Sequence, residues 1–145
     1  MNKLFTGLSF LLLISCTTPT PSSIEGTWEL LSETKIEKGD TTFTEASKLI
    51  PMIKIINNSH FTFLRHDLQK GKDSTAMFSA GGGRYELKDG QYTEYLEYCS
   101  AREWENNTFH FTVSVDGDML NQQGQEKVEG TDIDRVIIEK YRRVR

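Results

Sequence analysis

From residue 24 onward, hydrophobic and polar side chains alternate with a period of two along most of the chain. Phe61 and Phe63 are separated by Thr62, and Phe109 and Phe111 share one phase among mostly polar neighbours. A period of two places every second side chain on the same face, so the pattern predicts half-buried antiparallel strands. The expected strands are 26–37, 40–45, 52–57, 60–67, 76–80, 82–88, 91–98, 107–115, 118–123 and 132–143.

Turn-forming residues separate these strands. The Asp-Gly pairs at 89–90 and 116–117 tolerate the positive φ angles that tight hairpins require. Three consecutive glycines at 81–83 are interpreted as a bulge or a sharp bend, because no Lys-Ser pair or helix follows to complete a phosphate loop. Helix is expected to be scarce, with single turns at 45–49 and 101–106.

Many short strands joined by hairpins predict one all-β domain over residues 24–145. Two architectures fit this pattern, a β-sandwich and an up-and-down barrel. A barrel removes the exposed sheet edges that a long meander of strands otherwise leaves. Periodicity by itself leaves both open.

The first residues carry a different pattern. Lys3 precedes an apolar run over residues 4–14, which a small serine follows. A charge, a short apolar region and a small residue near the cut indicate a secretory signal peptide over residues 1–15. The run is shorter than the roughly 20 apolar residues that a spanning helix needs. The tetrapeptide Leu-Ile-Ser-Cys at 13–16 resembles the lipobox of bacterial lipoproteins, and the alternative is an ordinary signal peptide followed by a chance cysteine.

The lipobox resemblance implies that Cys16 carries lipid and binds the protein to a membrane. Residues 16–23 are rich in Thr, Pro and Ser, and prolines keep such a tether extended. Several acyl chains on one cysteine make membrane residence effectively permanent. A threonine after the cysteine, in place of an inner-membrane retention signal, implies export to the bacterial outer membrane, with either leaflet open.

Composition and cysteine content narrow the function further. The formal net charge is −4 at pH 7, so the chain lacks the basic surface that nucleic-acid binding needs. The basic cluster at 140–145 is interpreted as a strand end with solvated charges. If Cys16 is lipidated, Cys99 is the one remaining cysteine and no intramolecular disulfide forms. We expect Cys99 to act as a small buried apolar residue.

A Gly-x-Trp motif, Gly26 and Trp28, opens the first strand of the domain, and Arg143 lies on the last. These two ends resemble the signature of the calycin superfamily, which contains lipocalins and fatty-acid-binding proteins. The chain also resembles bacterial lipocalin-like lipoproteins, whose Tyr-x-Glu and aromatic-x-Arg-Val motifs match residues 92–94 and 141–144. The chain lacks the disulfide pair and the Thr-Asp-Tyr motif of many true lipocalins.

This resemblance implies a single antiparallel up-and-down β-barrel of about 8–10 strands with little helix. It also implies that Trp28 plugs one end of the barrel while Arg143 packs across its indole face, as a cation over a π-surface. The apolar phase of each expected strand supplies the candidate interior: Trp28, Leu30, Ile53, Ile55, Phe61, Phe63, Tyr85, Leu87, Phe109, Phe111, Val113, Ile137 and Tyr141.

Arg65 and Arg135 share the phase of these interior residues. An unpaired buried charge is costly, so each arginine needs a partner, either Glu94 or the anionic end of a ligand. A barrel of this size either holds one small ligand or is filled by side chains. The first case predicts a carrier of a small amphipathic molecule, and the second a module whose loops bind an envelope protein or a glycan. The expected ligand-binding residues are Arg65, Arg135, Glu94, Phe61, Phe63, Tyr85, Phe109, Phe111 and Tyr141.

Metal binding and catalysis are not expected. His60 and His66 lie about 20 Å apart on one extended strand, and they share the polar face of their strands with His110. The sequence contains no Ser-His-Asp order, paired-carboxylate signature or nucleophile elbow. We therefore expect a monomeric protein that is not an enzyme and carries no metal or cofactor.

The lipobox generates the first prediction. Replacing Cys16 (Cys16→Ala) removes the acylated thiol, so the protein is expected to move from the membrane fraction to the soluble fraction. Fractionation after a high-salt wash measures this, and Cys99→Ala is the matched control that stays with the membrane. Retention of the Cys16→Ala protein on membranes would contradict the lipoprotein assignment.

Overall fold

The computed structural model describes residues 23–45, 50–74 and 76–145. Ten strands and one short 3₁₀ helix are formed within these ranges. The elements are β1 (Gly26–Glu37), β2 (Asp40–Glu45), β3 (Met52–Ile56), β4 (His60–His66), β5 (Phe78–Lys88), β6 (Gln91–Leu96), β7 (Tyr98–Cys99), η1 (Arg102–Trp104), β8 (Asn107–Asp116), β9 (Met119–Lys127) and β10 (Asp134–Arg143).

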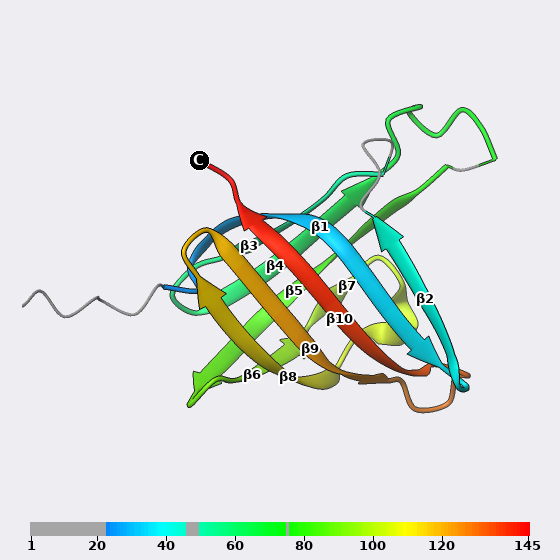
Figure 1. Cartoon of the computed structure of the whole chain (residues 1–145). Coiled ribbons are helices and arrows are strands. Elements are labelled where there is room, and N and C mark those ends of the chain that lie inside the picture. The colour runs from blue at the N-terminus through cyan, green and yellow to red at the C-terminus, as the bar shows by residue number, and fades with distance from the viewer. Residues whose placement is uncertain (1–22, 46–49, 75) are drawn as a thin grey trace, which may run out of the picture.

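Eight of the strands close into an antiparallel barrel (Figure 1). The order around it is β1-β3-β4-β5-β6-β8-β9-β10, and β10 pairs with β1 to complete the ring. The strand β2 pairs only with β1, and β7 continues the line of β6 along β5. The expected all-β fold class and barrel are thus confirmed, and closure decides against the sandwich.

The long strand β1 has two roles. Its first residues, Gly26 to Glu29, pair with β3, whereas Ser32 to Glu37 pair with β2. Opposite β10, its register shifts between Leu30 and Ser32. A β-bulge moves the following side chains to the other face. Leu30 and Glu33 therefore both point into the barrel, although residues three positions apart on a regular strand lie on opposite faces.

The glycine stretch 81–83 is not a bend. The strand β5 runs unbroken from Phe78 to Lys88, so the expected break into strands 76–80 and 82–88 was wrong. The bulge lies on the neighbouring strand, because Tyr85 pairs with Glu94 but Gly82 pairs with Tyr98. A Cβ on Gly83 would collide with the Tyr95 carbonyl, so the glycines allow the bulged strand to approach closely.

The turn expected at 101–106 is confirmed as η1, while that expected at 45–49 lies almost entirely outside the described residues. The core is one cluster inside the barrel. Its most buried large members, none more than 2 % exposed, are Trp28, Ile56, Tyr92, Phe111, Leu120, Ile137 and Tyr141.

Three residues expected inside the barrel do not lie there. In β3 the inward phase is Met52, Lys54 and Ile56, so Ile53 is only half-buried and Ile55 is 37 % exposed. Apart from its lysine, the run Met-Ile-Lys-Ile-Ile is apolar on both faces of the strand. The sequence analysis took the face with the lysine as the outer one, and this choice was wrong. Leu87 is 44 % exposed because it lies next to the β5–β6 turn.

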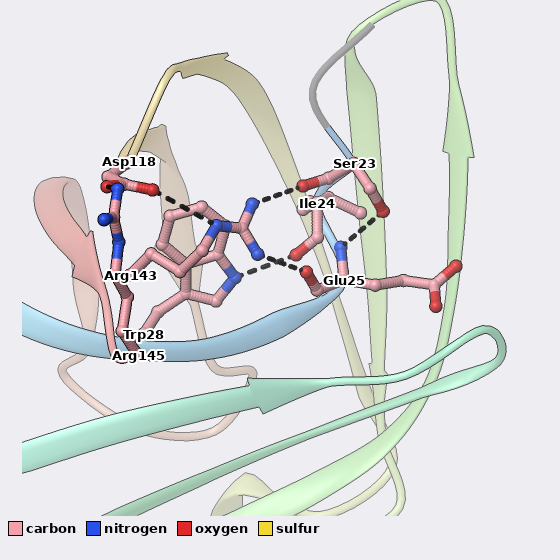
Figure 2. Close-up of polar contacts among 7 residues, drawn as sticks. All are labelled: Ser23, Ile24, Glu25, Trp28, Asp118, Arg143 and Arg145. Carbon is pink, nitrogen blue, oxygen red and sulfur yellow. Dashed lines mark hydrogen bonds and ion pairs between the residues drawn. The ribbon is translucent and has the colours of Figure 1, made fainter. Parts of the chain in front are cut away.

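Trp28 and Arg143 close one end of the barrel (Figure 2). The Arg143 guanidinium carbon lies 4.0 Å from the centroid of the Trp28 ring, which is the stack that the calycin resemblance implied. Trp28 Nε1 donates a 2.8 Å hydrogen bond to the Ile24 carbonyl, and Arg143 donates to the carbonyls of Ser23 and Glu25 at 2.7 and 2.6 Å. These bonds fasten the start of the domain across the plug.

Gly26 is required at this closed end for two reasons. Its φ is +140°, a conformation that side chains disfavour. A Cβ on Gly26 would also collide with the Arg143 guanidinium. The Gly-x-Trp motif therefore has a steric basis in the stack itself.

The plug generates the second prediction. Trp28→Ala should lower the free energy of unfolding by about 3–5 kcal/mol, because it empties a fully buried aromatic site. Chemical denaturation followed by circular dichroism measures the change. The control Phe43→Ala, at a side chain 65 % exposed, should stay within about 0.5 kcal/mol of the wild type. Equal stabilities for the two variants would rule out the plug.

Candidate functional site: a charged cavity inside the barrel

The barrel contains a cavity of about 270 Å³ on the side of the core away from the Trp28 plug. Two partly exposed ion pairs, Arg65–Glu33 and Arg135–Glu126, lie at its mouth. Lys54, Glu139 and Tyr141 line it at depth and are at most 8 % exposed. Its apolar wall consists of Met52, Phe63, Leu96, Trp104, Phe109, Phe111 and Ile137.

Most of the expected ligand-binding residues meet at this cavity, and two do not. Phe61 is buried in the core outside the lining. Tyr85 is half-buried, and its hydroxyl donates a 2.8 Å hydrogen bond to the Asn57 carbonyl. The expected residues that line the cavity are Arg65, Arg135, Glu94, Phe63, Phe109, Phe111 and Tyr141.

Lys54 is the residue that sequence reasoning missed. It is 2 % exposed, and its Nζ donates to Glu94 Oε1 at 2.7 Å and to Gln122 Oε1 at 2.8 Å. Glu94 thus neutralises Lys54, and the expectation that it pairs with Arg65 or Arg135 was wrong. The sequence contained a signal for the inward position of Lys54, because Lys54 lies on the same face of the strand as Met52 and Ile56.

Aromatic rings surround the same ammonium group. The Lys54 Nζ lies 5.6–6.0 Å from the centroids of four rings, a distance at which a cation and a π-face attract. These contacts and two hydrogen bonds replace the water that the buried charge loses. The four rings belong to Phe61, Tyr92, Phe111 and Tyr141.

The two arginines at the mouth are paired to different degrees. Arg135 donates through Nε and through a second nitrogen to one oxygen of Glu126, both at 2.7 Å, and stacks 5.4 Å from the Trp104 ring. Arg65 makes a single 3.5 Å contact with Glu33. The Nε of Arg65 is buried and has no hydrogen-bond partner in the described part of the chain. Arg65 can therefore donate at least one further hydrogen bond.

Glu139 is the carboxylate without a cation of its own. It is 8 % exposed and forms no ion pair within 4.0 Å among the described residues. Burial raises the pKa of Glu139 from 4.5 to about 7, against the opposing pull of Lys54. Burial likewise raises the pKa of the phenols of Tyr92 and Tyr141, whose hydroxyls make no well-formed hydrogen bond within the described ranges.

The charges of the lining do not balance. The described residues around the cavity include three cations and four carboxylates. Lys54 pairs closely with Glu94 and Arg135 with Glu126, whereas Arg65 pairs only loosely with Glu33. Glu139 is left over. The cavity is consequently polar and charged along one side, whereas sequence reasoning expected aromatic residues with one or two arginines.

The remaining candidate groups are structural or exposed. Within the described ranges no three His, Cys, Asp or Glu side chains are grouped so as to hold a metal ion. His60 and His110 lie outside the barrel beside Ser59 and Thr93. Cys99, expected to be buried, is half-buried, since the short strand β7 leaves it at the rim of the cavity.

No protein-family model matches the chain, and no curated protein sequence is significantly similar to it. The described residues contain no helix that is long and apolar enough to cross a membrane. The closed eight-stranded barrel is consistent with a calycin-like fold.

The raised pKa of Glu139 generates the third prediction. A carboxyl that binds its proton more tightly when folded stabilises the protein below its unfolded pKa of about 4.5, and this stability is lost as the pH rises through 7. Glu139→Gln has no such proton to lose. The variant should match the wild type near pH 4.5 and exceed it by about 3 kcal/mol at pH 8.

Denaturant titrations at a series of pH values measure this difference. Glu129→Gln is the matched control, because that side chain is 85 % exposed and should show no pH-dependent difference from the wild type. A constant offset between Glu139→Gln and wild type across the pH range would contradict the raised pKa.

Proposed function

We propose that this protein is an exported lipoprotein, anchored to the bacterial outer membrane through Cys16, that binds a small amphipathic molecule in its barrel. The observation that carries the proposal is the incompletely paired Arg65 in the wall of the cavity. A buried donor without a partner is costly, and a ligand with an anionic or accepting end satisfies it.

The geometry of Arg65 suits this role. Its one ionic contact, 3.5 Å to Glu33, is longer than a good charge-assisted hydrogen bond. Its side chain is 26 % exposed, so the guanidinium is accessible from the mouth. Arg135, by contrast, is held by Glu126 and Trp104 and has less to gain from a ligand. Arg65 is therefore the expected anchor for the anionic end.

The size of the cavity limits the ligand. About 270 Å³ lies just below the roughly 300–1,000 Å³ that is common for small-molecule pockets. The aromatic and aliphatic wall, which includes Phe63, Leu96 and Trp104, provides an apolar surface for the body of the ligand. A short amphipathic carboxylate fits these limits better than a long fatty acid.

The position of Ser23, the first residue that the structure describes, supports an anchored carrier. The chain enters the barrel at Ser23, whose carbonyl is bound by Arg143 at the plugged end. The cavity lies toward the opposite end, where β10 begins at Asp134. A tether leading from Cys16 to the plugged end would leave the mouth pointing away from the membrane, free to exchange ligand.

One observation favours the alternative, an interaction module that binds a protein or a glycan and catalyses nothing. Three aromatic side chains, Phe43, Phe78 and Tyr98, are 65–71 % exposed on the outside of the barrel. Aromatic side chains are enriched at protein–protein interfaces relative to the rest of the surface. Failure of the binding experiment below would favour this reading.

Binding of short carboxylates is the fourth prediction. Unbranched alkanoates of 4–12 carbons, titrated into the delipidated wild type by isothermal calorimetry, should include members that bind saturably at one site. Arg65→Gln should weaken binding by about tenfold, the effect of losing one hydrogen bond to a charged group.

The matched control is Arg84→Gln. Arg84 is paired with Glu97 on the outside of the barrel, so its loss should leave binding unchanged. If neither alkanoates nor their ω-amino derivatives bind the wild type, or if both arginine variants bind as tightly as the wild type, the carrier proposal is wrong.

A further inference from the structure

Glu139 is the feature of the cavity that the proposed function does not use. Its carboxylate is more than nine-tenths buried, lines the cavity and has no cation of its own among the described residues. The hydroxyl of Tyr141, two residues along the same strand, is buried beside Glu139, and the two groups interact without the geometry of a full hydrogen bond. The Glu139 carboxylate and the Tyr141 hydroxyl are thus two deeply buried polar groups that can form further hydrogen bonds.

The register places this deep site next to the Arg65 site. Glu139 on β10 lies directly across from Glu33 on β1. Arg65 contacts that same Glu33 at 3.5 Å. Opposed residues in an antiparallel pair lie about 5 Å apart, so only one side chain separates the unpaired carboxylate from the underpaired guanidinium. A single small molecule can reach both.

We propose that Glu139, with Tyr141 and Glu33, binds an ammonium group, so that the ligand is a small zwitterion whose anionic end binds at Arg65. The inference rests on the proposed function and specifies its ligand. It follows from the charge of the lining, where one carboxylate exceeds the number of cations. An ammonium group neutralises that carboxylate and donates several hydrogen bonds at once.

The cations already present do not exclude an ammonium group. Lys54 on β3 is neutralised by Glu94 of β6 at 2.7 Å. Arg135, on the same strand as Glu139, is neutralised by Glu126 of β9. The other charged groups facing Glu139 are Glu33 of β1 and Arg65 of β4, and in the complex Arg65 is neutralised by the carboxylate of the ligand. The neutral polar groups near Glu139 include the phenols of Tyr92 and Tyr141 and the amide of Gln122, which lies opposite Glu139 on β9.

Binding of a zwitterion and binding of a simple carboxylate are expected to change the protonation of Glu139 in opposite directions. In the empty cavity burial raises the pKa of Glu139 to about 7, so a fraction of the molecules carry a proton there at neutral pH. An ammonium group favours the ionised carboxylate, and the displaced proton goes to the buffer. A purely anionic ligand favours the protonated form and takes a proton up. The sign of the proton change therefore separates the two ligand classes.

The experiment compares three probes of matched length, for example hexanoate, 6-aminohexanoate and hexylamine, extended over 4–8 carbons. Calorimetry at pH 7 in two buffers of different ionisation enthalpy gives both the affinity and the number of protons exchanged. The aminoalkanoate of best length is expected to bind at least tenfold more tightly than the alkanoate and to release protons.

The matched variants are Glu139→Gln and Glu129→Gln. In Glu139→Gln the preference for the aminoalkanoate and the proton release should both disappear, and in Glu129→Gln both should persist. Circular dichroism checks that each variant is folded. The proton measurement on the wild type tests the proposal even if Glu139→Gln is unstable.

The outcomes separate this inference from the function on which it rests. Alkanoates that bind as tightly as aminoalkanoates at every length, or proton uptake in place of release, overturn the zwitterion and leave the carrier standing. A preference for the aminoalkanoate that survives Glu139→Gln overturns the assigned site. No binding by any probe overturns both.

Discussion

The ammonium group of Lys54, held at the centre of a closed barrel, is the constraint on which the rest of the interior depends. At 2 % exposure it has lost its water, and a lone buried charge is among the costliest features a fold can contain. The barrel surrounds it with one carboxylate, one amide oxygen and four aromatic faces. Glu94, Gln122 and the core aromatic residues are thereby fixed in position.

The pairing of Lys54 determines what is left for a ligand. Because Glu94 is taken, Arg65 and Arg135 must use Glu33 and Glu126, and the last carboxylate, Glu139, has no cation. Buried ion pairs seldom stabilise a protein more than apolar residues of the same volume. The lining contains one buried pair, two partly exposed pairs and an unmatched acid, and we propose that this arrangement serves recognition of a polar molecule rather than stability.

Much of the fold followed from the sequence, since period-two alternation and Asp-Gly turns predicted an all-β chain with most strands in place. The plug was predictable as well, because Gly26, Trp28 and Arg143 form a motif with its own steric logic. The interior charges were not. The phase of β3 is ambiguous in a run that is apolar on both faces, and the β1 bulge that turns Glu33 inward leaves no mark in the hydrophobic pattern.

The central claim is that the cavity holds one carboxylate more than it can neutralise, and the titration of Glu139 tests this most directly. Carbon-13 NMR of the glutamate side-chain carboxyls, with the Glu139 signal assigned by its absence from Glu139→Gln, follows each group separately. The account predicts a midpoint near 7 for Glu139 in the ligand-free protein, against the ordinary value of 4.5. A Glu139 carboxyl that titrates at the ordinary carboxylate value would show that its charge is already neutralised, and would contradict the account.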